Sequence, residues 1–248
     1  MKLELLSVIV PAYNEGPSIE KALEAVFAVP VKKEVIVVDD GSTDETAEIV
    51  EKLSKVLTKQ NKYSYLKELK FVKKEENSGK GSAIRSGLSL VSGDVVLIQD
   101  ADLELDPNEY PKLLAPFKEM EADIVFGSRF RREGIIRVQQ TFHFLGNKAL
   151  TWFSNLCTGF YLTDMETGFK VFRSDLMKGF KLISNRFGIE PELAARAAQA
   201  TRKKRLNFYE VSVSYRPRTI AEGKKMRFFR GGVIALLAVI YFNFINKS

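Results

Sequence analysis

Two aspartates spaced two residues apart carry the most specific chemical signal in the sequence. Asp100 and Asp102 close an apolar run that reads as a strand, and alternate residues of a strand share one face. Two close carboxylates repel each other unless a cation lies between them. Mg²⁺ or Mn²⁺ binds one or two protein carboxylates together with phosphate oxygens, so we expect a metal–diphosphate role, with Glu104 completing the set. Asp106 before Pro107 already supplies the helix cap, which leaves the pair without a purely structural explanation.

A second acidic pair, Asp39 and Asp40, follows another apolar run and precedes a helical pattern. Ser42 or Thr43 can cap that helix, but a cap does not explain two adjacent carboxylates. Acids at such strand ends accept hydrogen bonds from a base or a ribose, as in dinucleotide-binding folds. Residues 11–15 add a rigid turn, an aromatic ring and a carboxylate.

The elements that must position these side chains alternate along the first half of the chain. The expected strands are 6–10, 34–39, 69–73, 94–100 and 123–127, and the expected helices are 18–27, 44–57, 81–91 and 107–120. This alternation predicts an α/β fold with a mostly parallel sheet and right-handed crossovers. In such sheets the ligand lies at the carboxyl ends of the strands, where the acidic clusters fall.

The second half of the chain changes character without a linker or repeat. We expect helices over 139–156 and 191–200 and a strand over 208–215, with 163–173 between them. These elements predict an elaboration of one catalytic domain, residues 1–226, followed by a C-terminal helix, residues 227–248.

Composition restricts the possible chemistry. The 248 residues carry 38 Lys and Arg against 31 Asp and Glu, a net charge of +7, and 45% are hydrophobic, which excludes disorder. One cysteine, Cys157, excludes an intramolecular disulfide and a Cys-rich zinc site, and one histidine, His143, excludes a His-based metal cage. Oxygen ligands must therefore hold any metal.

The C-terminal segment 231–245 contains no charged residue and follows a basic stretch, 216–230. It is shorter than the about 20 apolar residues that a bilayer span needs. Because it is apolar all round, it predicts a helix on an anionic membrane surface or, alternatively, a helix buried in the core or in a dimer. The basic runs 129–132 and 202–205 accompany no nucleic-acid-binding motif, so we expect no nucleic-acid partner.

Four motifs in this order and strand context resemble those of family 2 glycosyltransferases with the GT-A fold, and among these the dolichyl- and polyprenyl-phosphate sugar synthases. The motifs are Pro11-Ala12-Tyr13-Asn14-Glu15, Val38-Asp39-Asp40-Gly41-Ser42, Asn77-Ser78-Gly79-Lys80-Gly81 and Asp100-Ala101-Asp102. The resemblance covers about residues 5–230. It implies a Rossmann-like GT-A domain, a nucleotide-sugar donor, Mg²⁺ or Mn²⁺, and a lipid-phosphate acceptor.

The same resemblance assigns roles on the donor side. The nucleotide contacts that it implies are Pro11, Tyr13, Glu15, Asp39, Asp40, Lys80 and Ala101. Lys80 either reaches a phosphate or anchors its loop. Asp100 would orient the donor and Asp102 bind the metal, with Glu104 standing where many family members carry Gln.

On the acceptor side, Arg129 stands where the family places an arginine for the lipid phosphate. His143 and Asn147, four residues apart on one helix face, can donate hydrogen bonds toward that phosphate, although mannose synthases carry Arg and Ser there. Arg218 and Lys224 match a basic loop that closes on the diphosphate and the acceptor phosphate, where positive charge stabilises the leaving group. The implied catalytic set is Asp100, Asp102, Arg129 and Arg218.

Two further segments have open interpretations. Residues 164–170 resemble a stretch that lines the donor-sugar pocket, or form a capped turn before a buried strand. Glu190 stands where family members with sugar acceptors keep a catalytic base. A phosphate monoester has a second pKa of about 6 and is already a nucleophile, so we expect Glu190 to be a sugar contact or a helix N-terminal charge.

The predicted function is an inverting transfer of a hexose from GDP-mannose or UDP-glucose to dolichyl or undecaprenyl phosphate, at the cytoplasmic face of a membrane. Two alternatives remain: a family 2 glycosyltransferase acting on a glycan hydroxyl, and a non-catalytic nucleotide-sugar-binding scaffold.

Overall fold

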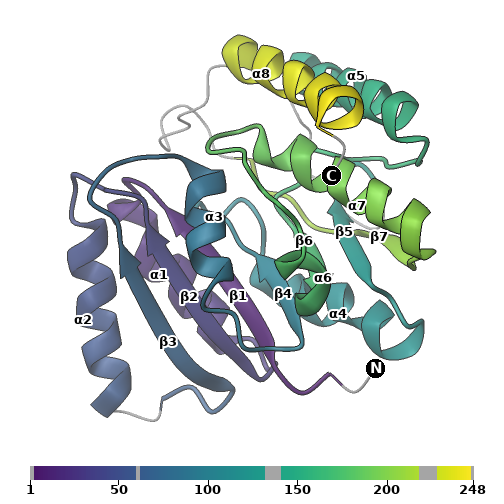
Figure 1. The fold of residues 1–248 in the computed structure, drawn as a ribbon. Helices are drawn as coiled ribbons and strands as arrows, with labels where there is room; N and C mark the ends of the chain where they lie inside the picture. Colours follow the sequence, from purple (N-terminus) through teal and green to yellow (C-terminus); the bar gives the residue numbers. More distant parts are fainter. Residues whose placement is uncertain (1–2, 60–61, 132–140, 218–227, 247–248) are drawn as a thin grey trace.

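A mixed sheet of seven strands forms the centre of the computed structural model, which describes residues 3–59, 62–131, 141–217 and 228–246 (Figure 1). The strands are β1 (Leu6–Ala12), β2 (Lys33–Asp39), β3 (Leu66–Lys73), β4 (Val95–Ile98), β5 (Ile124–Ser128), β6 (Lys170–Arg173) and β7 (Phe208–Ser212). Their order across the sheet is β3-β2-β1-β4-β6-β5-β7. The short strand β6 runs antiparallel to β4 and β5, whereas the other pairs are parallel, which confirms the expected mostly parallel α/β sheet.

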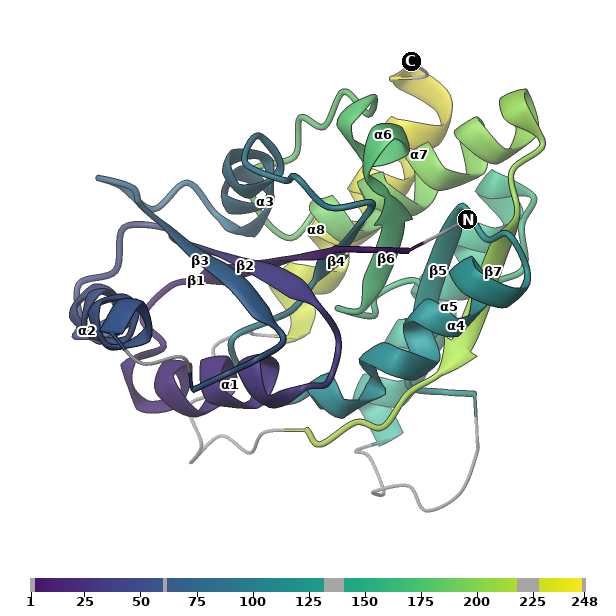
Figure 2. The same ribbon diagram turned by 90° about the horizontal axis from the view of Figure 1, so that it is seen from below.

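Helices cover both faces of the sheet. They are α1 (Gly16–Ala28), α2 (Thr46–Lys59), α3 (Lys80–Leu88), α4 (Tyr110–Glu119), α5 (Thr141–Thr158), α6 (Ser174–Lys178), α7 (Ile189–Lys204) and α8 (Phe228–Ile240), with a π-helical turn, Tyr241–Ile245, after α8. Figure 2 shows α1, α2 and α4 on one side of the sheet and α3, α6 and α7 on the other. Seen in Figure 1, α8 lies beside α5 at one end of the molecule, and the two helices are in contact.

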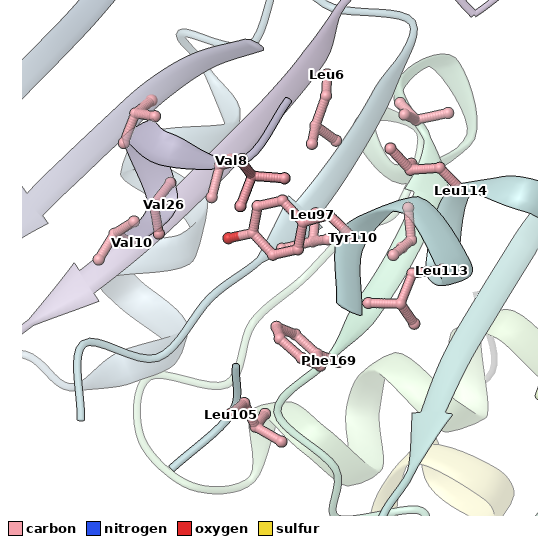
Figure 3. Packing of buried hydrophobic residues seen from close by; sticks show 14 of the residues in the cluster. Leu6, Val8, Val10, Val26, Leu97, Leu105, Tyr110, Leu113, Leu114 and Phe169 are labelled. Carbon is pink, nitrogen blue, oxygen red and sulfur yellow. The ribbon is translucent and has the colours of Figure 1, made fainter. Parts of the chain in front are cut away.

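Alternate residues of the central strands enter two separate hydrophobic cores. Val8 and Val10 of β1 pack with α1 and α4, whereas Ile9 packs with α3 and α7. Each such side chain contributes about 1.5–3 kcal/mol when it is fully buried. In the first core Tyr110 lies among Val8, Leu97 and Phe169 (Figure 3), and its hydroxyl donates to Gln99 Oε1 at 2.8 Å.

The chain leaves the sheet earlier than the sequence predicts at the end of β4. The expected strand 94–100 is observed only over Val95–Ile98, and Gln99 instead donates its side-chain amide to the carbonyl of Asp100 at 2.9 Å. A turn follows in which Leu103 has a φ of 60°. Contrary to the prediction from the sequence, Asp100 and Asp102 therefore do not share one face of a strand. Both lie in the turn that follows β4.

Candidate active site

The loops after β1 and β2 are tied together by polar side chains. Asp44 accepts hydrogen bonds from the backbone of Gly16 and of Thr46, each at 3.0 Å, so one carboxylate satisfies the start of both α1 and α2. The prediction that Ser42 or Thr43 caps the second helix is therefore wrong. Asp44 caps it instead, because its two carboxylate oxygens can accept from the first backbone amides of both helices. The Ser42 hydroxyl instead accepts from the backbone of Asn14 at 2.9 Å.

The two acids of the second motif differ in what binds them. Both oxygens of Asp40 accept hydrogen bonds within the protein, from the Lys74 ammonium and from the backbone of Gly79. Asp39 is fully buried, and its Oδ1 accepts from Ser42. Its Oδ2 is buried and accepts no hydrogen bond from the described residues. Asp40 thus anchors the Gly79 turn, and Asp39 has an oxygen available for a donor group of a ligand.

Four further predicted nucleotide contacts differ in exposure: three lie in or just after β1, and one lies on the turn after β4. Pro11 is half-buried near the end of β1, Tyr13 is 38% exposed, and Ala101 is buried on the turn after β4. Glu15 is half-buried, accepts from the Ser18 hydroxyl at 2.7 Å, and precedes α1.

A buried chain of alternating charges connects the donor-side residues to α7. The Lys80 ammonium lies 2.6 Å from Asp100 Oδ1 and 2.7 Å from Glu190 Oε1, and the Lys170 ammonium lies 2.6 Å from Glu190 Oε2. Burial opposes ionisation of these groups, but the paired charges outweigh it, so the pKa of Lys80 is raised and the pKa of Glu190 is lowered. In this structure Lys80 anchors its loop to Asp100 and Glu190.

The carboxylates proposed for the metal lie together on the turn after β4. The backbone of Glu104 donates to Asp102 Oδ1 at 3.1 Å, and both side chains are half-buried. The Tyr215 hydroxyl donates to Glu104 Oε2 at 2.9 Å, which ties the turn to the segment after β7. Within the described residues, three or more His, Cys, Asp or Glu side chains nowhere gather around a possible metal position. Two hard oxygen donors still fit Mg²⁺ or Mn²⁺, which takes its other ligands from phosphate and water.

On the acceptor side, Arg129 at the end of β5 is held by a buried carboxylate. Its Nε and Nη2 donate to the two oxygens of Asp164 at 2.7 and 2.8 Å, and its backbone donates to Asp164 at 3.0 Å. Burial opposes the charge of Arg129, but Asp164 outweighs it and raises the pKa of the guanidinium. This role of Asp164 could not be predicted from the sequence, because the two residues are far apart along the chain.

A second cation, which the sequence did not reveal, contacts the same aromatic ring as Arg129. The Lys148 ammonium of α5 is 4.9 Å from the centre of the Phe130 ring, and the Arg129 guanidinium carbon is 5.4 Å from the same centre. Asn147, the preceding residue of α5, is half-buried. The backbone of His143 belongs to α5 as expected, but its side chain is not among the described ones. Arg218 and Lys224 lie outside the described residues.

Comparison with known proteins agrees with this architecture. Residues 7–181 match the family described as "Glycosyl transferase family 2". The dodecaprenyl-phosphate galacturonate synthase of Rhizobium johnstonii is 28% identical over 96% of this chain and 67% of its own length. The dolichyl-phosphate beta-glucosyltransferase of Trichomonas vaginalis is 32% identical over 90% of this chain and 68% of its own length.

Solved structures support the fold. The crystal structure of glucosyl-3-phosphoglycerate synthase from Mycobacterium tuberculosis with uridine diphosphate superimposes with a TM-score of 0.69 at 20% identity, covering 99% of this chain and 82% of that one. This likeness and the mostly parallel sheet flanked by helices confirm the expected GT-A fold. The match over residues 7–181 and the two relatives confirm the resemblance of the sequence motifs. This chain therefore belongs to glycosyl transferase family 2.

Proposed function

We propose that this protein is an inverting glycosyltransferase that moves a hexose from a nucleoside diphosphate sugar to a polyprenyl phosphate at a membrane surface. The donors that we propose are GDP-mannose or UDP-glucose, and the acceptors are dolichyl or undecaprenyl phosphate. Support for a lipid-phosphate acceptor comes from the relatives, which are named for dodecaprenyl phosphate and dolichyl phosphate.

The observation that carries the acceptor class is the environment of Glu190. A sugar hydroxyl needs a general base, and Glu190 stands where the resemblance would place one. Lys80 and Lys170 each bind one oxygen of this carboxylate, and they keep its pKa below the ordinary value. A carboxylate stabilised in its charged form by two ammonium groups is a poor proton acceptor. A phosphate monoester, ionised at neutral pH, does not need one.

In the proposed reaction an oxygen of the lipid phosphate attacks the anomeric carbon from the side opposite the diphosphate. The new carbon–oxygen bond forms as the bond to the β-phosphate oxygen breaks, and the electron pair leaves with the nucleoside diphosphate. Arg129, oriented by Asp164, receives the acceptor phosphate together with Asn147 and His143. Arg218 and Lys224 are proposed to stabilise the diphosphate and the acceptor phosphate, in a segment outside the described residues.

On the donor side, Asp39 contacts the base or ribose through its unpartnered Oδ2, and Asp100 orients the donor. Asp102 and Glu104 would hold Mg²⁺ or Mn²⁺, which supplies positive charge to the diphosphate when bound. A complex of the Mycobacterium enzyme contains Mn²⁺ and uridine diphosphate, which supports a divalent metal in this fold.

The membrane-surface part of the proposal is supported by an exposed apolar face on α5 and the C-terminal helix. Ala235 and Val239 of α8 are buried, so one stripe of this helix is packed against the protein. Several of its other described side chains are exposed, as are some of the neighbouring helix α5, and the most exposed apolar ones of both helices and the following turn are Leu145, Trp152, Leu156, Leu237, Phe244 and Ile245. Exposed apolar side chains gathered on neighbouring elements are typical of an interaction surface. No helix in the described part of the chain has the length and apolar character needed to cross a bilayer.

A product assay tests the proposal. Purified protein, Mn²⁺ and a short polyprenyl phosphate are incubated separately with radiolabelled GDP-mannose and UDP-glucose, with Asp102→Ala as the control. We expect label to enter the organic phase from one donor and to stay in the aqueous phase with the variant. Metal-dependent hydrolysis of the donor without lipid product would indicate that the acceptor is a hydroxyl compound and not a lipid phosphate. Donor binding without transfer or hydrolysis would indicate a non-catalytic scaffold.

A further inference from the structure

Glu166 is a half-buried residue with one buried carboxylate oxygen, and the proposed mechanism does not use it. It lies in the segment between α5 and β6, and its Oε1 is inaccessible to solvent and accepts no hydrogen bond from the described residues. The adjacent Thr167 is fully buried and its hydroxyl also lacks a partner there. Buried polar groups are almost always paired in folded proteins, and an unpaired one costs about 1–3 kcal/mol. Two neighbouring unpaired groups indicate partners that arrive with a ligand.

The position of this segment identifies where such a ligand lies. A Cβ atom added to Gly168 would clash with Asp100 Oδ2, so the backbone here runs directly against the donor-side aspartate. The carbonyl of Thr167 accepts from the Lys170 ammonium, which binds Glu190. The residues that follow Glu166 therefore contact the donor side of the site, through Asp100 and through Lys170.

Charges from both halves of the site act on Glu166. Glu190 of α7 and Lys170 of β6 act from the donor side, and Arg129 after β5 and Asp164 from the acceptor side. Burial is the largest effect and Glu190 the next, and together they raise the pKa of Glu166 to about 7. Glu166 therefore interacts electrostatically with groups of both halves of the site, while the backbone at Gly168, two residues along, lies against Asp100. We place the transferred sugar beside this segment.

Three cations in the described part of this region each pair with a carboxylate of the protein. Lys80 is bound by Asp100 and Glu190, Lys170 by Glu190, and Arg129 by Asp164. A sugar carboxylate placed here would meet an additional buried acid, whereas a sugar hydroxyl would give that acid the hydrogen bond that it lacks. Like charges held in one buried site disfavour each other's ionised form.

We propose that Glu166 is a specificity-determining residue that accepts a hydrogen bond from a hydroxyl group of the transferred sugar and so selects neutral hexoses against uronic acids. This inference rests on the proposed function, because it assigns the donor sugar of that same site.

Donor binding tests the inference without the lipid acceptor. Calorimetry at pH 8 with Mn²⁺ compares UDP-glucose with UDP-glucuronate and UDP-galacturonate, and GDP-mannose with GDP-mannuronate. We expect the wild-type protein to bind the hexose donor roughly 10- to 100-fold more tightly than the matching uronate donor, the range of a hydrogen bond to a charged group. In Glu166→Gln this ratio should fall to within about threefold of unity, since the amide has no charge.

Glu210→Gln is the matched control. Glu210 is another largely buried acid of this region, but its oxygens accept from the backbone of Thr163 and Asp164. We expect this variant to melt at a lower temperature and to keep the wild-type donor ratio. Equal binding of hexose and uronate by the wild type, or an unchanged ratio in Glu166→Gln, overturns the inference.

The outcome separates this inference from the proposed function. A hexose-selective donor site without transfer to polyprenyl phosphate would refute the lipid acceptor and leave Glu166 as assigned. Transfer to lipid with equal use of uronate donors would do the reverse. Absence of binding by every nucleotide sugar would overturn both.

Discussion

Asp164 holds Arg129 through both of its carboxylate oxygens, at 2.7 and 2.8 Å from Nε and Nη2. Because this is a buried bidentate pair, it fixes the plane of the guanidinium at the end of β5. The remaining amino group, Nη1, is the one that the proposed mechanism turns toward the acceptor phosphate.

Replacing Asp164 with Asn should therefore affect the acceptor more than the donor. We expect the KM for polyprenyl phosphate to rise at least about tenfold while the KM for the donor changes little. Removing one partner of a buried ion pair should also lower the free energy of unfolding by about 3–5 kcal/mol. Initial rates at varied acceptor and donor, together with denaturant unfolding, check both. An unchanged acceptor KM in a folded variant would contradict the role of Arg129.

Glu190→Gln should distinguish positioning from base catalysis. If Glu190 only holds Lys80 and, through it, Asp100, the variant should keep measurable turnover, reduced by about tenfold, with an unchanged pH profile. Loss of a general base typically costs 10²–10⁴-fold. Glu192→Gln on the same helix is the control for folding, because Glu192 accepts from the backbone of Ile183 and Ser184 at 2.9 and 2.8 Å. If the turnover rate of Glu190→Gln no longer reached a constant value at alkaline pH, Glu190 would be a general base and the acceptor a hydroxyl group.

Removal of divalent metal should abolish transfer, because the diphosphate would lack its counter-charge. After treatment with EDTA we expect activity to return on titration with Mn²⁺ or Mg²⁺. Glu104→Gln should need a several-fold higher metal concentration, since an amide oxygen is a weaker ligand than a carboxylate. Full activity in EDTA would show that Asp102 and Glu104 serve another purpose.

The raised pKa of Glu166 predicts a stability effect with a defined sign. Its pKa is about 7 in the folded protein against 4.5 for the free side chain, so the native state binds more protons than the unfolded state between these values. Stability is therefore lost as the pH rises from about 4.5 to 7 and stays low above that range. We expect ligand-free Glu166→Gln to be more stable than wild type at pH 8, by on the order of 2–3 kcal/mol, and equal near pH 4.5. Unfolding curves at both pH values measure this difference, and equal stability at pH 8 would contradict it.

Membrane association should depend on the exposed apolar face of α5 and α8. We expect Trp152→Gln combined with Leu237→Gln to reduce sedimentation with anionic vesicles severalfold, because these side chains are 65% and 60% exposed. Val56→Gln on α2 is the control, since this side chain is also exposed, at 42%, but lies on a different helix. Unchanged sedimentation of the double variant would assign the face to another partner.

The sequence was sufficient for the strands and motifs and insufficient for the pairings between distant residues. β-branched runs predicted β1 and β2 because both are buried on two faces. The sequence did not distinguish the roles of Asp39 and Asp40, because the difference depends on Lys74 and Gly79, which are brought in by the next strand and loop. One of the two interpretations of residues 164–170, a turn before a buried strand, anticipated β6, but a run of four residues does not reveal its antiparallel direction or its place between β4 and β5.

In the candidate site, too, the sequence revealed the individual residues but not the contacts between distant ones. The acids at strand ends were identified from their spacing, and the structure gathers Lys80, Asp100 and Glu190 into one network. The partnership of Arg129 with Asp164, and the position of Lys148, depend on how α5 and the segment after it fold over β5. Periodicity carries no information about such contacts.

Strand β6 lies between β4 and β5, although it follows both in the sequence. During synthesis β5 therefore emerges before either of its neighbours in the sheet, β6 and β7, exists. The first four strands can assemble as a parallel unit. One edge of β5 stays unpaired until β6 is made, about 45 residues later, and the other until β7 is made, about 85 residues later. An unpaired apolar strand is prone to aggregation. The chain is therefore most exposed to aggregation while the residues between β5 and β7 are being synthesised.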